Sequence, residues 1–453
     1  MLLIGKRIHF MGIGGIGVSA LAEMALAEGA AVSGCDRTEN DLTRKLAAKG
    51  IEVKIGHHPD HAIGIDLLVH TSAVPPDHPE RAAAGNRQEK RGLFLARFLD
   101  ARPSAGVAGT HGKTTTTWLI AHLLIQGNLD PSVFVGGVVS DLPDGNHREG
   151  IGPFVAELDE SDESFLLPKL KVAVVTNIES DHLSHYGTED ALFAAFDRFA
   201  ANAEKNGILV AGIDNPGSAR LLSRNRRGKR SFGLSPEADI RGEIGFAAKG
   251  ETRFRAFRFN RDLGEFILPL PGRHNVQNAL AAIAVAMELG LDADVARRAL
   301  ASVKGVERRL ERLGTIGDTA LYSDYAHHPT EAAASLAALR ENHAGRLLTV
   351  FQPHLYTRTR DYADAFGQAL ARSDALILAD VYPAREEPIP GVSSELILDS
   401  ARRINPDASG PFPLEKAATE AAARAGDFAA VVFMGAGDID DAARRLARRG
   451  EKR

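Results

Sequence analysis

The sequence has a single cysteine, Cys35, among its 453 residues. One cysteine rules out an intramolecular disulfide and a cysteine-based zinc site, and we expect Cys35 to be a small packing residue rather than a nucleophile. The chain also lacks an apolar run long enough to cross a membrane, and the patterned segment after Met1 shows no signal-peptide h-region or cleavage site. These absences predict a cytoplasmic protein with no membrane partner.

An excess of charge of one sign is also missing. The net charge of -5 and the isoelectric point near 6.4 argue against general binding to nucleic acid or to anionic membranes. Hydrophobic residues make up 44% of the chain and charged residues 25%, which is ordinary for globular proteins with buried cores. A chain of 453 residues exceeds what one core usually organises, so we expect two to three domains.

The motif around which the chain is organised is a glycine-rich segment from Val107 to Thr117, followed by an apolar stretch that predicts a helix ending at Gly127. Such a loop suits a phosphate, because glycines let the backbone wrap it, the helix N-terminus directs N–H groups at it, and Lys113 adds a positive charge. Thr114 would place its hydroxyl on a Mg²⁺ ion. The strict pattern has glycine where this chain has Val107, so a polar turn that caps an ordinary helix is the alternative.

A second glycine motif lies near the N-terminus. Gly12, Gly14 and Gly17 follow the G-x-G-x-x-G spacing between an apolar strand and an amphipathic helix, and Asp36 stands just after a second strand predicted for residues 30–34. This pattern is typical of a turn that binds a diphosphate on the helix N-terminus. Glycines alone do not separate NAD from a nucleotide-sugar, and they could also serve only tight packing of strand against helix.

Two further strands after the phosphate loop end in polar residues. A run of five carboxylates begins at Glu157, and the next buried strand is followed by Asn177, Asp181 and His182. Ligands in doubly wound folds sit beyond the carboxyl ends of the strands, so we expect these side chains and the phosphate loop at one edge. Together with Thr114 they would suit a divalent metal on phosphates. A solvated acidic loop and a structural Asp–His pair are the alternatives.

The second half of the chain changes character twice. Alternating residues from 253 to 268 predict antiparallel strands. Asn275 and Asn278 then lie three apart at the start of an alanine-rich helix, where they could bind a nucleobase edge and Asn275 could cap the helix. From about residue 305 strands and helices alternate, which predicts a second parallel sheet. Its strand ends carry residues 324–328 and 352–358, whose histidines and arginines suggest a carboxylate or phosphate pocket, although each could be a surface residue.

The motifs occur along the chain as Gly12-Ile-Gly-Gly-Ile-Gly, Gly109-Thr-His-Gly-Lys-Thr-Thr-Thr, Glu157-Leu-Asp-Glu-Ser-Asp, Asn177-Ile-Glu-Ser-Asp-His, Gly272-Arg-His-Asn-Val-Gln-Asn-Ala, Asp324-Tyr-Ala-His-His-Pro-Thr-Glu, Gln352-Pro-His, Glu386-Glu-Pro-Ile-Pro-Gly and Gly435-Ala-Gly-Asp-Ile. In this order they resemble the motifs of the Mur ligase family over nearly the whole chain, and most of all those of its alanine-adding branch. The family's phosphate loop also lacks the leading glycine, which accounts for Val107.

The resemblance implies an α/β protein of three domains. We expect a Rossmann-like domain for the UDP-sugar at residues 1–103, a central P-loop domain for ATP at residues 104–304, whose parallel sheet carries added antiparallel strands, and a C-terminal Rossmann-like domain for the amino acid at residues 305–453. The implied activity is ATP-dependent ligation of L-alanine to UDP-N-acetylmuramate through an acyl phosphate, with ATP and Mg²⁺, by a monomer or weak homodimer. It belongs to the synthesis of peptidoglycan precursors.

Three other functions compete with this one. Within the family, a murein-peptide recycling ligase would use the same nucleotide-sugar. An NAD(P)-dependent oxidoreductase would leave the phosphate loop and the C-terminal motifs unexplained. A UDP-sugar sensor without catalysis would not need Lys113, Glu157 and His182.

The resemblance also implies individual roles. Contacts to ATP fall on Gly109, Thr110, His111, Gly112, Lys113, Thr114, Thr115, Asn275, Asn278, Arg308 and Asp324, and contacts to the metal on Thr114, Glu157 and His182. Contacts to the two substrates fall on Gly14, Gly15, Gly17, Asp36, Ser72, His327, His328 and Arg358, of which His328 and Arg358 would hold the L-alanine carboxylate. The expected catalytic residues are Lys113, His182, Asp324, His328 and Arg358. Many relatives carry arginine where this chain has Leu355, and Asp197 stands near the place of the activating lysine of later-acting relatives.

Overall fold

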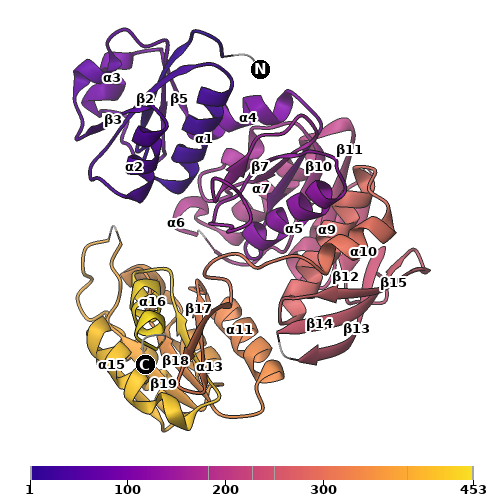
Figure 1. Ribbon diagram of the computed structural model, residues 1–453, viewed down its shortest axis with the longest axis vertical. Helices are drawn as coiled ribbons and strands as arrows, with labels where there is room; N and C mark the ends of the chain where they lie inside the picture. Colours follow the sequence, from indigo (N-terminus) through magenta and orange to yellow (C-terminus); the bar gives the residue numbers. More distant parts are fainter. Residues whose placement is uncertain (1–2, 182, 227, 249, 385, 451–453) are drawn as a thin grey trace. The chain divides into compact units, whose positions relative to one another are not determined.

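The computed structural model describes residues 3–181, 183–226, 228–248, 250–384 and 386–450 (Figure 1). The chain divides into two compact units. One comprises Met1–Glu243, Ala256–Gly264 and Gln277–Val303, and the other comprises Ile244–Arg255, Glu265–Val276 and Lys304–Arg453. Three sheets, each flanked by helices, confirm the α/β class predicted from the sequence.

The first sheet is parallel throughout and has the strand order β3-β2-β1-β4-β5. Its elements are β1 (Arg7–Met11), α1 (Ile16–Ala27), β2 (Ala31–Asp36), α2 (Asp41–Ala48), β3 (Glu52–Ile55), η1 (Pro59–Ala62), β4 (Leu67–His70), α3 (Pro79–Ala84), β5 (Gln88–Lys90) and α4 (Arg91–Asp100). The predicted second strand therefore continues through Asp36, which places this carboxylate at the strand end rather than beyond it.

The central sheet has ten strands in the order β15-β14-β13-β12-β11-β10-β6-β9-β7-β8. Its strands are β6 (Ser104–Ala108), β7 (Ser132–Phe134), β8 (His147–Arg148), β9 (Phe154–Glu157), β10 (Leu170–Val175), β11 (Ala203–Gly212), β12 (Lys229–Gly233), β13 (Ile240–Ala248), β14 (Glu251–Arg258) and β15 (Arg261–Leu268). Its helices are α5 (Lys113–Gln126), η2 (Ser164–Leu166), α6 (Leu183–Tyr186), α7 (Glu189–Ala201), α8 (Pro216–Arg224), α9 (Arg273–Glu288) and α10 (Ala293–Leu300).

The position of β6 in this sheet determines what its loop can reach. β6 pairs in parallel with β10 on one side and with β9 on the other. All five residues of β6 are buried, because helices cover both faces of a mainly parallel sheet. The polar ends of three neighbouring strands therefore meet at one edge, as the sequence predicts.

The third sheet has the order β16-β17-β21-β18-β19-β20, and β16 runs antiparallel to β17. Its strands are β16 (Glu311–Ile316), β17 (Thr319–Asp324), β18 (Leu347–Phe351), β19 (Ala375–Ala379), β20 (Ala408–Phe412) and β21 (Ala430–Met434). Its helices are α11 (Pro329–Asn342), α12 (Tyr356–Asp361), α13 (Ala363–Leu370), α14 (Glu395–Arg402), α15 (Leu414–Arg424), η3 (Ala425–Asp427) and α16 (Ile439–Gly450). The prediction of a parallel sheet is thus right for its interior and wrong at the β16 edge.

Two separate apolar clusters lie on the faces of this third sheet. One contains side chains of α11, α13 and α14, and the other contains side chains of α15 and α16. β18, β19 and β21 are buried along their whole length between these layers. Across the described residues, no helix is both long and apolar enough to span a membrane.

Candidate nucleotide and substrate sites

The phosphate loop joins β6 to α5 through residues 109–112, and two of its positions admit only glycine. Gly109 has φ of +128° and Gly112 has φ of +80°, a backbone region that side chains disfavour. A Cβ at Gly109 would lie 2.2 Å from Thr176 Oγ1, and one at Gly112 would lie 2.6 Å from Asn278 Oδ1. The loop can therefore approach its neighbours, and a ligand, only with bare backbone.

Asn177, at the end of β10, fastens this loop. Its Oδ1 accepts a hydrogen bond from the His111 N–H at 2.9 Å, and its Nδ2 donates to the His111 carbonyl at 3.0 Å. Its own carbonyl accepts from the Thr110 N–H. Thr110 also exchanges hydrogen bonds with Glu179, since the Glu179 N–H donates to Thr110 Oγ1 at 2.8 Å. The loop conformation is therefore fixed by the neighbouring strand.

Lys113 begins α5 and points back across the loop. Its ammonium donates to the Gly109 carbonyl and to Glu160 Oε1, each at 2.7 Å. Burial raises the pKa of the Glu160 carboxyl to about 7, against the lowering effect of Lys113. Burial acts to lower the pKa of Lys113, but Glu160 outweighs it and the pKa is raised. Glu160 was not among the predicted site residues; the acidic run that contains it was the only sequence signal.

Thr114 and Glu157 lie together beside the loop. The Thr114 hydroxyl donates to Glu157 Oε1 at 3.1 Å, and the Gly136 N–H donates to Glu157 Oε2 at 2.7 Å. A hydroxyl and a carboxylate are the hard oxygen ligands that Mg²⁺ prefers, so this pair fits the ion. Gly136 was not predicted. His182, the third predicted metal ligand, lies outside the described residues.

Three more of the predicted ATP residues lie on two helices. Thr115 is buried in the first turn of α5, where the N–H groups have no carbonyl partner within the helix. Asn278 of α9 accepts a hydrogen bond from the Thr116 hydroxyl at 3.1 Å, which ties α9 to α5. Asn275 donates to the Pro271 carbonyl at 2.8 Å. α9 begins at Arg273, so Asn275 lies within its first turn and is not its N-cap; the capping interpretation is wrong.

The N-terminal glycine loop is organised by Asp36. Asp36 Oδ2 accepts a hydrogen bond from the Gly14 N–H at 2.8 Å, and Asn40 Nδ2 donates to the Gly14 carbonyl at 3.1 Å. A Cβ at Gly14 would lie 2.7 Å from Asn40 Nδ2, so glycine is required for this close approach. Gly15 is the N-cap of α1. The predicted glycines and Asp36 therefore form one cluster at the start of a helix.

Two further predicted positions flank this cluster. A Cβ at Gly17 would lie 2.8 Å from the Arg91 guanidinium. Ser72 is exposed in the turn that follows β4.

Asp324 and Arg308 lie close to the strand ends of the third sheet. Asp324 Oδ2 accepts from the Leu310 N–H at 2.8 Å, and its Oδ1 accepts from the Ala326 N–H at 2.7 Å. Burial raises the pKa of Asp324 to about 6, and these N–H groups act against the rise. Arg308 donates to the carbonyls of Gly435 and Gly437 at 2.9 and 3.0 Å.

The predicted amino-acid residues surround the same strand ends. His328 is the N-cap of α11, and its Nδ1 accepts from the Thr330 N–H. Burial, opposed by the charge of Glu331 and helped by that of Arg358, lowers the pKa of His327 to about 4. Leu355 is the N-cap of α12 with φ of +71°, and its carbonyl accepts from the Thr359 hydroxyl at 2.8 Å. The positively charged Arg358 thus lies near the imidazole of His327.

A phosphate loop with a lysine, a hydroxyl–carboxylate pair suited to Mg²⁺ and two further Rossmann-like sheets define an ATP-dependent enzyme. Three family models cover most of the chain: "Mur ligase family, catalytic domain" at residues 7–101, "Mur ligase middle domain" at residues 107–286, and "Mur ligase, glutamate ligase domain" at residues 308–437. The chain belongs to the Mur ligase family, and it is an ATP-dependent ligase that forms amide bonds.

Several relatives that match at nearly full length share one name. A UDP-N-acetylmuramate–L-alanine ligase of Sorangium cellulosum is 41% identical over 98% of this chain and 97% of its own length. One from an Anaeromyxobacter species is 43% identical over 97% of each chain. The solved UDP-N-acetylmuramate–alanine ligase of Thermotoga maritima has a TM-score of 0.83 and 30% identity, and the match covers 98% of this chain and 99% of that one.

A murein peptide ligase of Psychrobacter arcticus is also similar, with a TM-score of 0.70 and 24% identity over 98% of this chain and 99% of its own. At this identity it supports the shared fold alone.

Proposed function

We propose that the chain joins L-alanine to UDP-N-acetylmuramate at the expense of ATP, in the synthesis of peptidoglycan precursors. The observation that carries the proposal is the identity of 41–43%, at nearly full length, to relatives named UDP-N-acetylmuramate–L-alanine ligase. The phosphate loop that such an activity needs is intact. Lys113 donates a hydrogen bond to the Gly109 carbonyl of this loop, and the adjacent Thr114 donates one to Glu157. The alternative, a murein-peptide recycling ligase, is not favoured.

The reaction would proceed in two steps. The muramoyl carboxylate attacks the γ-phosphorus of ATP, and the bond from this phosphorus to the β-phosphate oxygen breaks. ADP departs, and the muramoyl group is now an acyl phosphate. The amine of L-alanine then attacks the acyl carbon, and phosphate departs as the amide forms and the amine loses a proton. Phosphoryl transfer depends on positioning and charge neutralisation more than on covalent help.

We propose the following roles in the first step. The bare backbone of Gly109 and Gly112 and the first turn of α5 would hold the phosphates. The Lys113 ammonium would break its ion pair with Glu160 and contact the transferred phosphoryl group instead. Mg²⁺ held by Thr114 and Glu157 would offset the negative charge of the phosphates.

Further roles follow for the other ATP contacts. Thr110, His111 and Thr115 would complete the loop around the phosphates. Asn275 and Asn278 would hold the nucleobase. His182 stays a predicted third metal ligand.

For the substrates we propose the two other sheets. Gly14, Gly15, Gly17, Asp36 and Ser72 would bind the UDP-sugar, with the diphosphate at the start of α1. Because Asp36 already accepts the Gly14 N–H, it orders the loop that receives the ligand.

The third sheet would bind the amino acid. His327, His328 and Arg358 would hold L-alanine, and Arg308 and Asp324 would contact ATP. We propose domain limits after residues 103 and 304, so that each sheet has its own domain. We also propose that the protein is a monomer or weak homodimer. A cytoplasmic location is proposed too, and the free, buried thiol of Cys35 is in keeping with it.

The decisive experiment measures phosphate release from ATP and Mg²⁺ with UDP-N-acetylmuramate and one of four acceptors: L-alanine, glycine, L-serine or the recycling tripeptide. We expect release that depends on L-alanine, with weaker release for glycine and serine, because a small pocket separates a methyl group by only about 1 to 3 kcal/mol. Release with the tripeptide alone would move the chain to the recycling branch. No release with any acceptor would favour a sensor.

A second test separates the two sites. Lys113→Ala should abolish turnover while the affinity for UDP-N-acetylmuramate, measured by calorimetry, changes little, because the two ligands would contact different sheets. Equal loss of both would contradict the assignment of the sites.

A further inference from the structure

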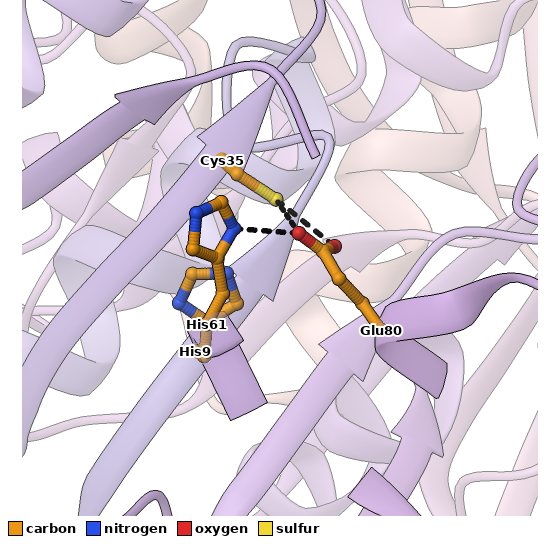
Figure 2. A group of neighbouring side chains, drawn as sticks. All are labelled: His9, Cys35, His61 and Glu80. Atoms are coloured by element: carbon orange, nitrogen blue, oxygen red, sulfur yellow. Dashed lines mark hydrogen bonds and ion pairs between the residues drawn. The ribbon is translucent and has the colours of Figure 1, made fainter. Parts of the chain in front are cut away.

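Four side chains that could bind a metal ion converge in the first sheet (Figure 2). They are His9 on β1, Cys35 on β2, His61 on η1 and Glu80 on α3, here called the His9 cluster. His9, Cys35 and Glu80 are almost completely buried. One donor atom from each of the four lies within 4.8 Å of the donor atoms of the other three. None of these residues belongs to the sites described above.

The distances within the cluster suit a tetrahedral ion. Cys35 Sγ lies 3.3 Å from Glu80 Oε2, and His61 Nδ1 lies 2.6 Å from Glu80 Oε1. Ligand atoms around Zn²⁺ at roughly 2.0 to 2.3 Å stand about 3.3 to 3.8 Å apart, so small side-chain rotations would complete the geometry. His57 Nδ1 is 3.3 Å from both Cys35 Sγ and Glu80 Oε2, and this half-buried ring offers a path of entry.

His9 provides a second, independent observation. Its side chain is 1% exposed, and its Nε2 is buried without a hydrogen-bond partner. Its other ring nitrogen, Nδ1, lies 2.8 Å from the Ser33 hydroxyl, which fixes the ring. A buried polar atom without a partner is costly. A ligating histidine typically has this arrangement, with one nitrogen held by a protein group and the other directed at the ion.

The charge balance of the cluster also points to a cation. In the neighbouring cluster of Glu23, Asp144 and His147, the ammonium groups of Lys45 and Lys49 form ion pairs with both carboxylates. Within the part of the chain that the structure describes, no lysine or arginine forms an ion pair with Glu80, whose carboxylate is completely buried. Glu80 instead accepts hydrogen bonds from the His58 N–H at 2.7 Å and from the Cys35 thiol, so neutral donors hold this buried carboxylate and a bound cation would replace the thiol proton.

We propose that the His9 cluster binds one Zn²⁺ ion through His9, Cys35, His61 and Glu80. The single cysteine excludes a site built from several thiolates, but a mixed set of thiolate, imidazole and carboxylate ligands is common for zinc. The Cys35 thiol donates a hydrogen bond to Glu80, so binding displaces this proton to solvent as the zinc–sulfur bond forms. Each ion bound would release one proton.

The ion would strengthen the loop that is proposed to receive the nucleotide-sugar. The Cys35 carbonyl accepts hydrogen bonds from the Gly12 and Ile13 N–H groups at 2.8 and 3.0 Å. An ion held by Cys35 would therefore join the base of the glycine loop to η1 and α3, which follow it in the chain. Its role is structural, and it takes no part in the transfer of phosphate.

The experiment uses the full chain without an affinity tag, freed of metal by a chelator and then titrated with Co²⁺. Because Cys35 is the only cysteine, a thiolate-to-cobalt absorption band can come from this residue alone. We expect a band that saturates at one Co²⁺ per chain and disappears when one equivalent of Zn²⁺ is added. A wild-type chain that shows no such band would overturn the proposal, and this result needs no variant that might misfold.

Two variants test the ligand set with Zn²⁺ itself. His61→Asn keeps a polar side chain but removes the imidazole, and it should weaken zinc affinity by at least about 100-fold, beyond the loss expected for an outer-shell partner. Asp144→Asn is the matched control in the neighbouring cluster and should leave zinc affinity unchanged. Equal zinc affinity in His61→Asn and wild type, or a loss confined to Asp144→Asn, would refute the His9 cluster as the site.

Discussion

The buried pair of Lys113 and Glu160 makes replacement of the lysine by methionine a quantitative test of the phosphate loop. Methionine keeps most of the side-chain volume and removes the charge. Glu160 is 1% exposed, so its carboxylate would be left buried without the ammonium that lies 2.7 Å away in the wild type. Removing one partner of a buried pair typically costs about 3 to 5 kcal/mol. The structure predicts how this cost depends on pH.

The pKa of Glu160 is near 4.5 when unperturbed and about 7 in the folded chain. Above pH 4.5 the folded chain binds a proton that the unfolded chain has lost, so the free energy of unfolding falls as pH rises, until the folded carboxyl ionises. Between pH 6 and the folded pKa near 7, the wild type loses about 1.4 kcal/mol of its free energy of unfolding through this group, and little more up to pH 8. Lys113→Met removes the charge that lowers this pKa, so the pKa rises further and the carboxyl stays protonated over more of this pH range. The variant should therefore lose more stability than the wild type between pH 6 and pH 8, by up to about 1.4 kcal/mol.

The assay is urea unfolding followed by the fluorescence of Trp118. This is the only tryptophan of the chain, it is 1% exposed, and it lies on α5 directly after the phosphate loop. The signal therefore reports the central sheet and not the other two. The control is the double variant Lys113→Met/Glu160→Gln, in which position 160 no longer carries a carboxyl group. At pH 8 it should be about 3 to 5 kcal/mol more stable than Lys113→Met, and it should still lack ligase activity.

Two results would refute this reasoning. If Lys113→Met lost the same stability at pH 6 and pH 8, Glu160 would not be the group left uncompensated. If the double variant were no more stable than Lys113→Met, the lysine would contribute through its packing and not through its charge.

Three further predictions concern the other sites. Gly109→Ala would place a Cβ 2.2 Å from Thr176 Oγ1, so it should destabilise the chain by about 1 to 3 kcal/mol and abolish binding of an ATP analogue; unchanged binding in calorimetry would contradict this. Glu157→Gln should raise the Mg²⁺ concentration for half-maximal activity at least about 10-fold without changing the KM for L-alanine, and an unaltered Mg²⁺ requirement would remove it from the metal site. His328→Ala should raise the KM for L-alanine at least about 10-fold and that for ATP less, whereas His343→Ala, at the other end of α11, should change neither; an unchanged alanine dependence of His328→Ala would exclude it from the pocket.

The elements that sequence reasoning located well are those whose residues are buried on both faces. The alternation of strands and helices predicted after about residue 305 is an example, because it contains β18, β19 and β21, which are buried along their whole length. β20 (Ala408–Phe412) escaped notice because it contains Gly410 and Pro411, which read as a turn. Proline is tolerated there because β20 is an edge strand, with one side that forms no ladder. That information belongs to the topology and not to the local sequence.

The candidate site was predictable where a motif fixes the local conformation. It was not predictable where two residues far apart in the sequence come into contact. Lys113 and Thr114 follow from the loop and helix. The choice among five neighbouring carboxylates does not follow from the local sequence, and Glu157 was predicted only through the family resemblance. The end of β9 and the turn after it direct Glu157 to Thr114 and Glu160 to Lys113. Cys35 was expected to be a simple packing residue; its hydrogen bond to Glu80 depends on a contact 45 residues away.

The hydrogen bond from the Gly136 N–H to Glu157 links the proposed metal site to the proposed diphosphate site. In the structure Glu157 is shared between the Thr114 hydroxyl and the Gly136 N–H. The segment that begins at Gly136 ends at Asn146, whose amide contacts the Ile16 carbonyl in the first turn of α1. If a cation bound Glu157 in place of the Gly136 N–H, one end of the segment 136–146 would lose its hydrogen bond. The other end would still be bound to α1, the helix proposed to bind the diphosphate. The proposed metal site and the helix proposed to bind the diphosphate are thus joined by one short segment of chain.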